Sequence, residues 1–221
     1  YVGKRFAREE VLRRHAMANN VPIFYVNAVG GQDELVFDGQ SMAIDRTGNL
    51  IAMGKQFDED LVITDIDPKV GTAPEISPIT YSREQEAFDA IVLGIRDYIH
   101  KSGFKRAIVG MSGGIDSSLT TCLCVEALGR ENVIGVSMPS RFSSEHSKND
   151  AQRLADNLGI CFIQFGISDI ISAYHNALGK PLEEIRRRFN ISGEDDDPVA
   201  DENIQPRIRG SCLMDISNRL K

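Results

Sequence analysis

The segment Gly110-Met111-Ser112-Gly113-Gly114-Ile115-Asp116-Ser117-Ser118 joins a short apolar run to a helical pattern. The apolar residues 107–109 before it are typical of a buried strand, and residues 117–128 carry apolar side chains at helical spacing. Glycines let the backbone approach an anion, and the N–H groups and dipole of a helix N-terminus attract one. The segment therefore predicts a phosphate-binding loop between a strand and a helix.

Asp116 adds an acid to this predicted phosphate loop. Its carboxylate would repel phosphate unless a cation lay between them, so the sequence predicts a Mg²⁺ ion that bridges Asp116 and phosphate oxygens. The loop matches neither of two common nucleotide fingerprints, Gly-x-x-x-x-Gly-Lys-Ser/Thr and Gly-x-Gly-x-x-Gly. An ordinary glycine-rich turn is the alternative, but such a turn requires neither the acid nor the serines.

Length and composition limit the class of protein. A chain of 221 residues allows one large or two modest domains, and 42% hydrophobic residues suffice for packed cores. The net charge of −7 argues against a nucleic-acid partner, which needs a basic face. No apolar run approaches the roughly 20 residues that span a bilayer, so no membrane partner is expected. The four cysteines have no metal or disulfide-framework spacing, which favours a reduced, cytoplasmic compartment.

The sequence predicts two domains joined by a linker. Residues 1–67 begin with a helix at 5–19, and short strands are expected at 22–26, 41–44, 50–53 and 61–65. Residues 68–81 contain prolines and a glycine and are expected to form an extended linker. Residues 82–221 then begin with a helix, for which Ser82 and Gln85 have the spacing of a capping box.

The second predicted domain alternates strands and helices after that first helix. Strands are expected at 105–110, 133–138 and 160–165, and helices at 117–128, 147–158 and 168–178. This alternation implies an α/β fold with a doubly wound parallel sheet that binds ligands at the carboxyl ends of its strands. The phosphate loop follows one such end. Met138 follows the next, where an adenine would stack on it; a position in the core is the alternative for Met138.

Three segments of the second domain resemble the NAD⁺ synthetase family: residues 110–117, 137–142 and 202–209. The last, Glu-Asn-Ile-Gln-Pro-Arg-Ile-Arg, distinguishes this family from other ATP pyrophosphatases that share the loop. In the first domain, Gly3-Lys4-Arg5 and residues 25–39 resemble the end of the nitrilase-like glutaminase that is fused to many such synthetases. Both signatures in this order indicate a glutamine-dependent NAD⁺ synthetase.

The resemblance implies an ATP-dependent amidation of deamido-NAD⁺ through an acyl-adenylate, with ammonia from glutamine and release of AMP and pyrophosphate. It implies that residues 110–118 and Met138 bind ATP and that Asp116 binds Mg²⁺. It also implies that Lys4 contacts glutamine, and that Asn203 and Arg207 contact deamido-NAD⁺. For Lys4 the alternative is a solvated helix face. For Asn203 it is the N-cap of a helix that begins at residue 204, with a proline in its first turn.

The resemblance also bears on what this chain contains. The catalytic Cys, Glu and Lys of the glutaminase lie upstream of Gly3 in the family, and further ATP and Mg²⁺ ligands lie downstream. The chain is therefore expected to be an inactive fragment: the C-terminal part of a nitrilase-like α/β sandwich followed by a truncated doubly wound domain. Members commonly form homo-oligomers.

Alternative functions remain open. A GMP synthetase-like amidotransferase would use the same loop with another acceptor, and a degenerate nucleotide-binding module would keep the loop without turnover. The acidic run at 194–197, with Asp201 and Glu202, is expected to be a solvated loop, although a second Mg²⁺ site is the alternative.

Overall fold

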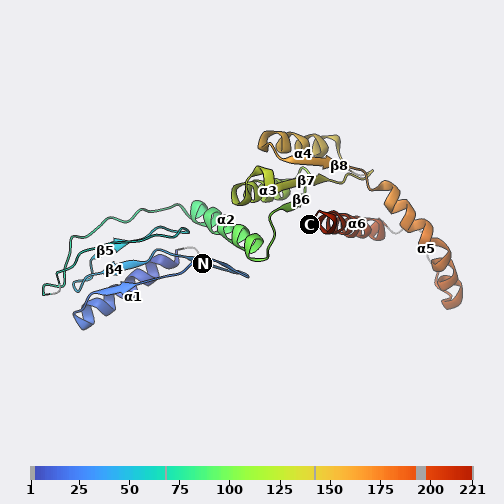
Figure 1. Ribbon diagram of the computed structural model, residues 1–221. Coiled ribbons are helices and arrows are strands. Elements are labelled where there is room, and N and C mark those ends of the chain that lie inside the picture. The colour runs from blue at the N-terminus through green and yellow to red at the C-terminus, as the bar shows by residue number, and fades with distance from the viewer. Residues whose placement is uncertain (1–2, 68, 142, 193–197, 221) are drawn as a thin grey trace. The chain divides into compact units, whose positions relative to one another are not determined.

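The computed structural model describes residues 3–67, 69–141, 143–192 and 198–220. Its internal contacts divide the chain into two units, Tyr1–Phe104 and Lys105–Lys221 (Figure 1). Antiparallel strands make up the sheets of the first unit, and parallel strands make up the sheet of the second. The two kinds of pairing agree with two different folds in one chain.

The first unit is built on a three-stranded antiparallel sheet. Strands β1 (Ile23–Tyr25), β4 (Met42–Ile44) and β5 (Leu50–Met53) pair in the order β1-β4-β5. Helix α1 (Lys4–Asn19) covers one face, where the fully buried Ala16 packs among Met42, Ile44 and Leu50. Ala43, Ile51 and Ala52 form a second buried cluster with residues of the following segment, so this sheet is covered on both faces.

The segment after β5 covers that second face without forming a strand in its described part. Ile66 and Ala73 pack on the sheet, and the backbone N–H of Ile76 donates to the carbonyl of Leu50 at 2.8 Å. The strand predicted at 61–65 is wrong, because no neighbouring strand pairs with it and its apolar residues Leu61 and Ile63 remain more than four-fifths exposed. Part of the predicted linker is therefore packed against the first unit.

A hairpin and a long helix complete the first unit. Strands β2 (Val29–Gln32) and β3 (Leu35–Asp38) form the hairpin, and α2 (Arg83–Lys101) packs on it. The Asp97 carboxylate accepts a 2.7 Å hydrogen bond from the N–H of Gly31, and Lys101 Nζ donates to the Gly31 carbonyl at 2.6 Å. Burial opposes the charge of Asp97, but the hydrogen bonds from Lys101 and Gly31 outweigh it and lower the pKa of Asp97.

Helix α2 begins where the sequence predicts. Ser82 is its N-cap, and the Ser82 hydroxyl accepts a hydrogen bond from the N–H of Gln85 at 3.1 Å. The Gln85 amide does not return the bond; it donates instead to Asp89, so half of the capping box forms. Because α2 packs on the β2–β3 hairpin, its contacts group it with the first unit, whereas the sequence assigns it to the second domain; the domain boundaries remain a prediction.

The second unit has three parallel strands in the order β6 (Ala107–Gly110), β7 (Val133–Ser137) and β8 (Cys161–Gln164). Helices α3 (Ile115–Leu128) and α4 (Glu145–Leu158) lie on one side of the strands, and α6 (Pro198–Arg219) lies on the other (Figure 1). A short 3-10 helix, Arg130–Asn132, precedes β7. This arrangement confirms the predicted α/β fold with a parallel sheet.

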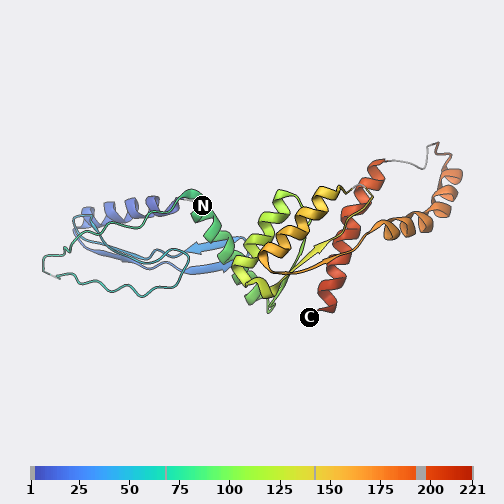
Figure 2. The same cartoon turned by 90° about the horizontal axis from the view of Figure 1, so that it is seen from above.

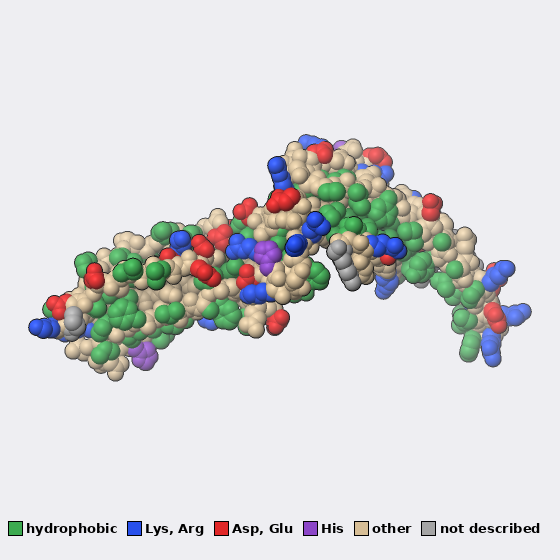
Figure 3. Space-filling model, in the orientation of Figure 1, with side chains coloured by type: hydrophobic (Ala, Val, Ile, Leu, Met, Phe, Trp, Pro, Cys, Tyr) green, Lys and Arg blue, Asp and Glu red, His purple; other side chains and the backbone are tan. Residues whose placement is uncertain are grey.

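Helix α5 (Ser168–Phe189) is longer than predicted, because it continues through Gly179 and Pro181 (Figure 2). Apolar side chains recur along it at helical spacing and are exposed (Figure 3): Tyr174, Leu178, Leu182, Ile185 and Phe189. In the part of the chain that the structure describes, no helix is both long and apolar enough to cross a membrane. All four cysteines are unpaired.

Candidate nucleotide site

The predicted phosphate loop lies between the carboxyl end of β6 and the first turn of α3. Gly113 has a φ of +82°, which favours glycine, and a Cβ at this position would collide with the backbone carbonyl of Ser147 in α4. The N–H of Met111 donates to the Val136 carbonyl at 2.8 Å, so the loop leaves the sheet in a fixed direction. Glycine at 113 is therefore required twice, by the backbone angle and by the close approach of α4.

The serine hydroxyls organise this loop. Ser117 and Ser118 each donate from Oγ to the carbonyl of Gly114, at 3.0 and 2.9 Å. Ser117 Oγ also accepts from the N–H of Ser112 at 3.2 Å and lies 3.1 Å from Ser112 Oγ. The Gly114 carbonyl therefore accepts hydrogen bonds from two side chains of the first turn of α3.

Several backbone donors at the loop remain available. The N–H groups of Gly113, Ile115 and Asp116 donate to no group among the described residues. Gly114, the N-cap of α3, carries no side chain to satisfy them, so the positive end of the helix dipole is open to an anion. Unsatisfied donors of this kind are suited to phosphate oxygens.

Asp116 lies in the first turn of α3, exposed and without a side-chain partner in the described part of the chain. One free carboxylate beside free N–H groups of a helix N-terminus fits Mg²⁺, which takes one or two carboxylates and fills its other positions with water and phosphate oxygens. The described residues contain no group of three or more His, Cys, Asp or Glu side chains that could hold a metal ion alone. The acidic run 194–197 lies outside those residues.

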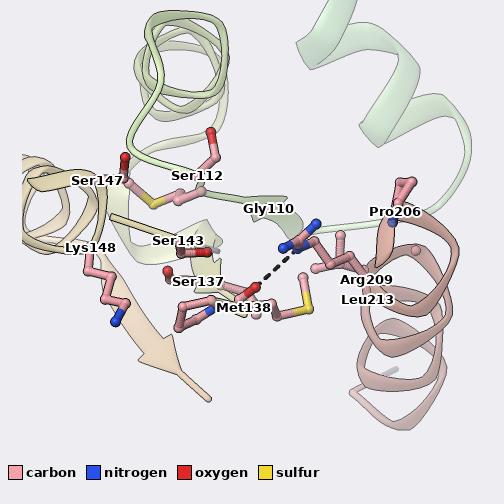
Figure 4. A pocket seen from close by; sticks show the side chains of 14 residues that line it. Gly110, Ser112, Ser137, Met138, Ser143, Ser147, Lys148, Pro206, Arg209 and Leu213 are labelled. Carbon is pink, nitrogen blue, oxygen red and sulfur yellow. Dashed lines mark hydrogen bonds between the residues drawn. The ribbon is translucent and has the colours of Figure 1, made fainter. Parts of the chain in front are cut away.

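A cavity of about 460 Å³ opens beside the loop (Figure 4). Its walls come from the loop, from the ends of β6 and β7, and from α4 and α6: Gly110, Met111, Ser112, Val136, Ser137, Met138, Pro139, Ser143, Ser147, Lys148, Pro206, Arg209, Gly210 and Leu213. Met138 is only 5% exposed and belongs both to this wall and to the core beneath α6. Met138 is therefore a core residue that also lines the cavity, and the stacking of adenine on it remains a prediction.

Arg209 is the cation that α6 contributes to the cavity wall. Its Nε donates to the Met138 carbonyl at 3.0 Å, and its guanidinium also donates to Gln205 Oε1 at 3.3 Å (Figure 4). Burial lowers the pKa of Arg209, but a guanidinium keeps its charge at neutral pH. The charge and the cavity therefore lie next to the edge of the sheet at which β7 ends.

Further polar bonds hold α6 against the loop that follows β7. Ser140 Oγ donates to Gln205 Oε1 at 2.9 Å in a buried contact. Asp201 accepts from Arg141 at 3.2 Å, and its other oxygen lies 3.0 Å from His175 Nε2 on α5. The first half of α6 is thus joined to two other elements, while Phe142 of the predicted motif lies outside the described residues.

Asn203 and Arg207 occupy a different position from the predicted one. Helix α6 begins at Pro198, so Asn203 is inside the helix and is not its N-cap, and Pro206 lies in the interior rather than in the first turn. Both side chains are exposed, and Arg207 donates to the carbonyl of Asn203 one turn earlier. They lie beside the cavity-facing row of α6, which runs through Pro206, Arg209, Gly210 and Leu213.

The predicted glutamine contact lies in the first unit, on the wall of a separate cavity. This cavity, of about 550 Å³, is lined by Lys4 and Arg8 from α1, by Glu86 and Ala90 from α2, and by residues of β1, β3 and the adjoining loops. Lys4 is exposed at the start of α1. Of the predicted ATP residues, Gly110, Met111, Ser112 and Met138 line the 460 Å³ cavity, whereas Lys4 lines the 550 Å³ cavity of the first unit.

Several residues that line the 460 Å³ cavity are not predicted from the sequence. Arg209 is part of the quoted motif, and its four-residue separation from Gln205 predicts a shared helix face, but its bond to Met138 spans 71 positions of the chain. Lys148, which lies on the cavity wall, is paired with Glu145 at 2.7 Å. Ser143 and Ser147 line the same wall, and no local pattern in the sequence identifies them.

Comparison with known proteins places this geometry in a family. A family model described as NAD synthase matches residues 87–221, and one described as carbon-nitrogen hydrolase matches residues 5–75. The chain belongs to the NAD synthase family. This confirms the resemblance that the phosphate loop and the α6 motif indicate, and the second match confirms the nitrilase-like character of the first unit.

Related proteins match nearly all of this chain. It is 43% identical to the glutamine-dependent NAD(+) synthetase of Synechocystis sp. over 98% of its length, and the match covers 38% of that protein. Identity to the Thermotoga maritima enzyme of the same name is 39%, over 99% of this chain and 42% of that protein. The chain therefore spans about two-fifths of the length of the curated relatives it matches.

A solved structure supports the same assignment. The glutamine-dependent NAD⁺ synthetase from Acinetobacter baumannii, in complex with adenosine diphosphate, superimposes with a TM-score of 0.83 at 34% identity. The match covers 99% of this chain and 40% of that one. The two units described above thus have the same folds as the matching part of that enzyme.

Proposed function

We propose that the full-length protein is a glutamine-dependent NAD⁺ synthetase and that this chain supplies its ATP loop and part of its glutamine site. The reaction joins ammonia to the nicotinate carboxylate of deamido-NAD⁺. The observation that carries the proposal is the loop at residues 110–118, in a chain of the NAD synthase family. The loop has free N–H groups at Gly113, Ile115 and Asp116, and its first three residues line a 460 Å³ cavity.

The proposed chemistry has two steps. An oxygen of the nicotinate carboxylate attacks the α-phosphorus of ATP, and pyrophosphate leaves with the electrons of the broken P–O bond. Ammonia then attacks the acyl carbon, loses a proton, and displaces AMP to give the amide. Pyrophosphate develops charge as it leaves, so fixed N–H donors at Gly113, Ile115 and Asp116 would stabilise it.

The cavity and the loop divide the binding of ATP between them. Residues 110–118 would hold the phosphates, while Met138 forms an apolar wall for the adenine. Arg209, beside that wall, would bring positive charge toward the α-phosphate or the adenylate. Asp116 would hold a Mg²⁺ ion, which when bound would neutralise part of the phosphate charge.

The remaining substrates involve residues outside the cavity wall. Asn203 and Arg207 are exposed on α6 beside the cavity-facing row, where they would contact deamido-NAD⁺. Lys4 would contact glutamine in the first unit. Homo-oligomeric assembly and a cytoplasmic location, which suits the four unpaired cysteines, belong to the same proposal; light scattering by the full-length protein tests the assembly.

An assay with two nitrogen sources tests the proposed function. The full-length protein receives ATP, Mg²⁺ and deamido-NAD⁺ with either glutamine or ammonium, and NAD⁺ and AMP are followed by chromatography. We expect NAD⁺ from both sources. Asp116→Asn should reduce both routes at least about a hundredfold by removing a charge that serves the transition state, whereas Lys4→Ala should impair only the glutamine route.

The same assay distinguishes the alternatives. Formation of AMP with xanthosine monophosphate but not with deamido-NAD⁺ would replace the proposal by a GMP synthetase-like activity. Nucleotide binding with no AMP from either acceptor would indicate a module without turnover. An equal loss of both nitrogen routes in Lys4→Ala would contradict the assignment of Lys4 to the glutamine site.

A further inference from the structure

The first turn of α1, which carries Lys4, depends on a residue of α2. Gly3 is the N-cap of α1, has a φ of +79° and offers no side chain to the free N–H groups of the helix. The carboxylate of Glu86 accepts a hydrogen bond from the N–H of Gly3, with oxygens at 3.1 and 3.3 Å. The two residues are 83 positions apart, so α2 supplies the cap that the sequence of α1 lacks.

The charge of Glu86 also suits this place. A carboxylate at a helix N-terminus interacts favourably with the positive end of the helix dipole, and no acidic residue occupies the first turn of α1 itself. A hydrogen bond to a charged acceptor is stronger than a neutral one. Glu86 therefore holds the backbone immediately before Lys4 in position.

A second contact, between α1 and β3, also holds the start of α1 in place. Arg8, one helical turn after Lys4, binds Asp38 of β3 through two hydrogen bonds of 2.7 and 2.8 Å. The side-chain amide of Asn27 also donates to Asp38, to Oδ1, at 2.8 Å, and this bond orients the carboxylate. Lys4 thus lies between one anchor on α2 and another on the β2–β3 hairpin, at the wall of the 550 Å³ cavity that Glu86 and Arg8 also line.

We propose that Glu86 is a positioning residue for the glutamine site: by capping α1 it fixes the turn that carries Lys4, so that the contact between α1 and α2 sets the apparent affinity for glutamine. This inference depends on the proposed function in one respect, the contact between Lys4 and glutamine. Glu86 itself touches no reacting atom. Its effect is exerted through the backbone of Gly3.

Three variants of the full-length protein test this inference. Glu86→Ala removes the cap, and Glu86→Gln keeps an acceptor but removes the charge. Glu84→Ala is the matched control, because Glu84 lies on the same turn of α2, is exposed and has no side-chain partner among the described residues. Glutamate release and NAD⁺ formation are measured separately, with glutamine and with ammonium as nitrogen source.

We expect Glu86→Ala to raise the KM for glutamine about tenfold, the effect of losing one charge-assisted hydrogen bond. The KM for ammonium and the rate with ammonium should stay at the wild-type values, as should both routes in Glu84→Ala. Glu86→Gln should recover most of the glutamine affinity. If Glu86→Ala does not fold, Glu86→Gln decides the question through a smaller rise in the KM for glutamine alone.

Two results would overturn the inference. One is an unchanged KM for glutamine in Glu86→Ala and Glu86→Gln, and the other is an equal loss of the glutamine and ammonium routes, which a general loss of stability would cause. Failure of the proposed function has a different signature, because the wild-type protein would then make no NAD⁺ from ammonium whatever its glutamate release.

Discussion

The guanidinium of Arg209 donates from Nε to the main-chain oxygen of Met138 at 3.0 Å. This bond joins α6 to the residue that follows β7, and it holds a positive charge beside the apolar wall of the nucleotide cavity. A second nitrogen of the guanidinium, Nη2, donates to Oε1 of Gln205 at 3.3 Å. The planar fork of arginine makes both contacts together, which the single ammonium of lysine does not reproduce.

Arg209→Lys should therefore weaken ATP binding while keeping the charge. We expect the KM for ATP to rise about tenfold in the ammonium-dependent reaction, because lysine cannot make both hydrogen bonds that orient the positive charge. Steady-state kinetics at saturating deamido-NAD⁺ measures this. An unchanged KM for ATP would show that the arginine supports the fold alone.

Arg207→Ala provides a contrast on the same helix. Arg207 is exposed and lies off the cavity wall, so we expect the KM for deamido-NAD⁺ to rise about tenfold, as for loss of one charged contact. The KM for ATP should remain unchanged. A rise in the KM for ATP without one for deamido-NAD⁺ would reverse the assignments of the two arginines.

Gly113→Ala should disable the phosphate loop. The positive φ and the contact with the Ser147 carbonyl both oppose a Cβ, and we expect the free energy of unfolding to fall by about 2 to 3 kcal/mol. Urea denaturation measures the change. Gly179→Ala in α5 is the control: nothing lies near its added Cβ, and alanine should stabilise the helix by about 0.5 to 1 kcal/mol. Equal effects at the two positions would contradict the explanation.

Asp45 predicts a pH dependence in the first unit. Its carboxylate is fully buried, and burial by itself would raise the pKa of Asp45; hydrogen bonds from Asn49 and Thr47 outweigh that effect and lower it. The carboxylate therefore stabilises the fold above the unfolded-state pKa of about 3.9, and this contribution is lost as the pH falls through the folded-state pKa.

Asp45→Asn should cost about 2 kcal/mol of unfolding free energy at pH 7, because its amide would place a donor against the Nδ2 of Asn49. The difference from wild type should shrink as the pH falls below about 4. Urea denaturation at pH 7 and at a pH below about 4 measures the difference in unfolding free energy. Asp65→Asn, at an exposed position, is the control and should change neither value; a constant difference across pH would refute the role of the charge.

Local sequence patterns account for much of the second unit and for the start of α2 in the first. Apolar runs before and after the loop predicted β6 and α3, because a buried strand and a helix impose different spacings on apolar residues. Ser82 correctly marked the start of α2, since an N-cap acts within its own turn. The site residues taken from the resemblance remain predictions, although Gly110, Met111, Ser112 and Met138 do meet at one cavity.

Features that depend on distant contacts were not predictable in the same way. Pro206 suggested a helix start, yet α6 continues through it, because Ile204 and Ile208 pack on the sheet. The proline leaves the carbonyl of Glu202 without its usual donor, and Glu202 is exposed, so water can satisfy it. Glu86 shows the same limit, since its partner is 83 positions away.

The close approach of Gly113 to α4 couples the motion of two segments. The loop can keep its conformation only while the backbone around Ser147 stays in place, because no side chain separates them. A ligand that immobilises the loop would therefore slow amide hydrogen exchange in the first turns of α4, including amides that the ligand does not touch. If the loop binds phosphate as proposed, local opening of α4 should in turn shorten the residence time of the nucleotide.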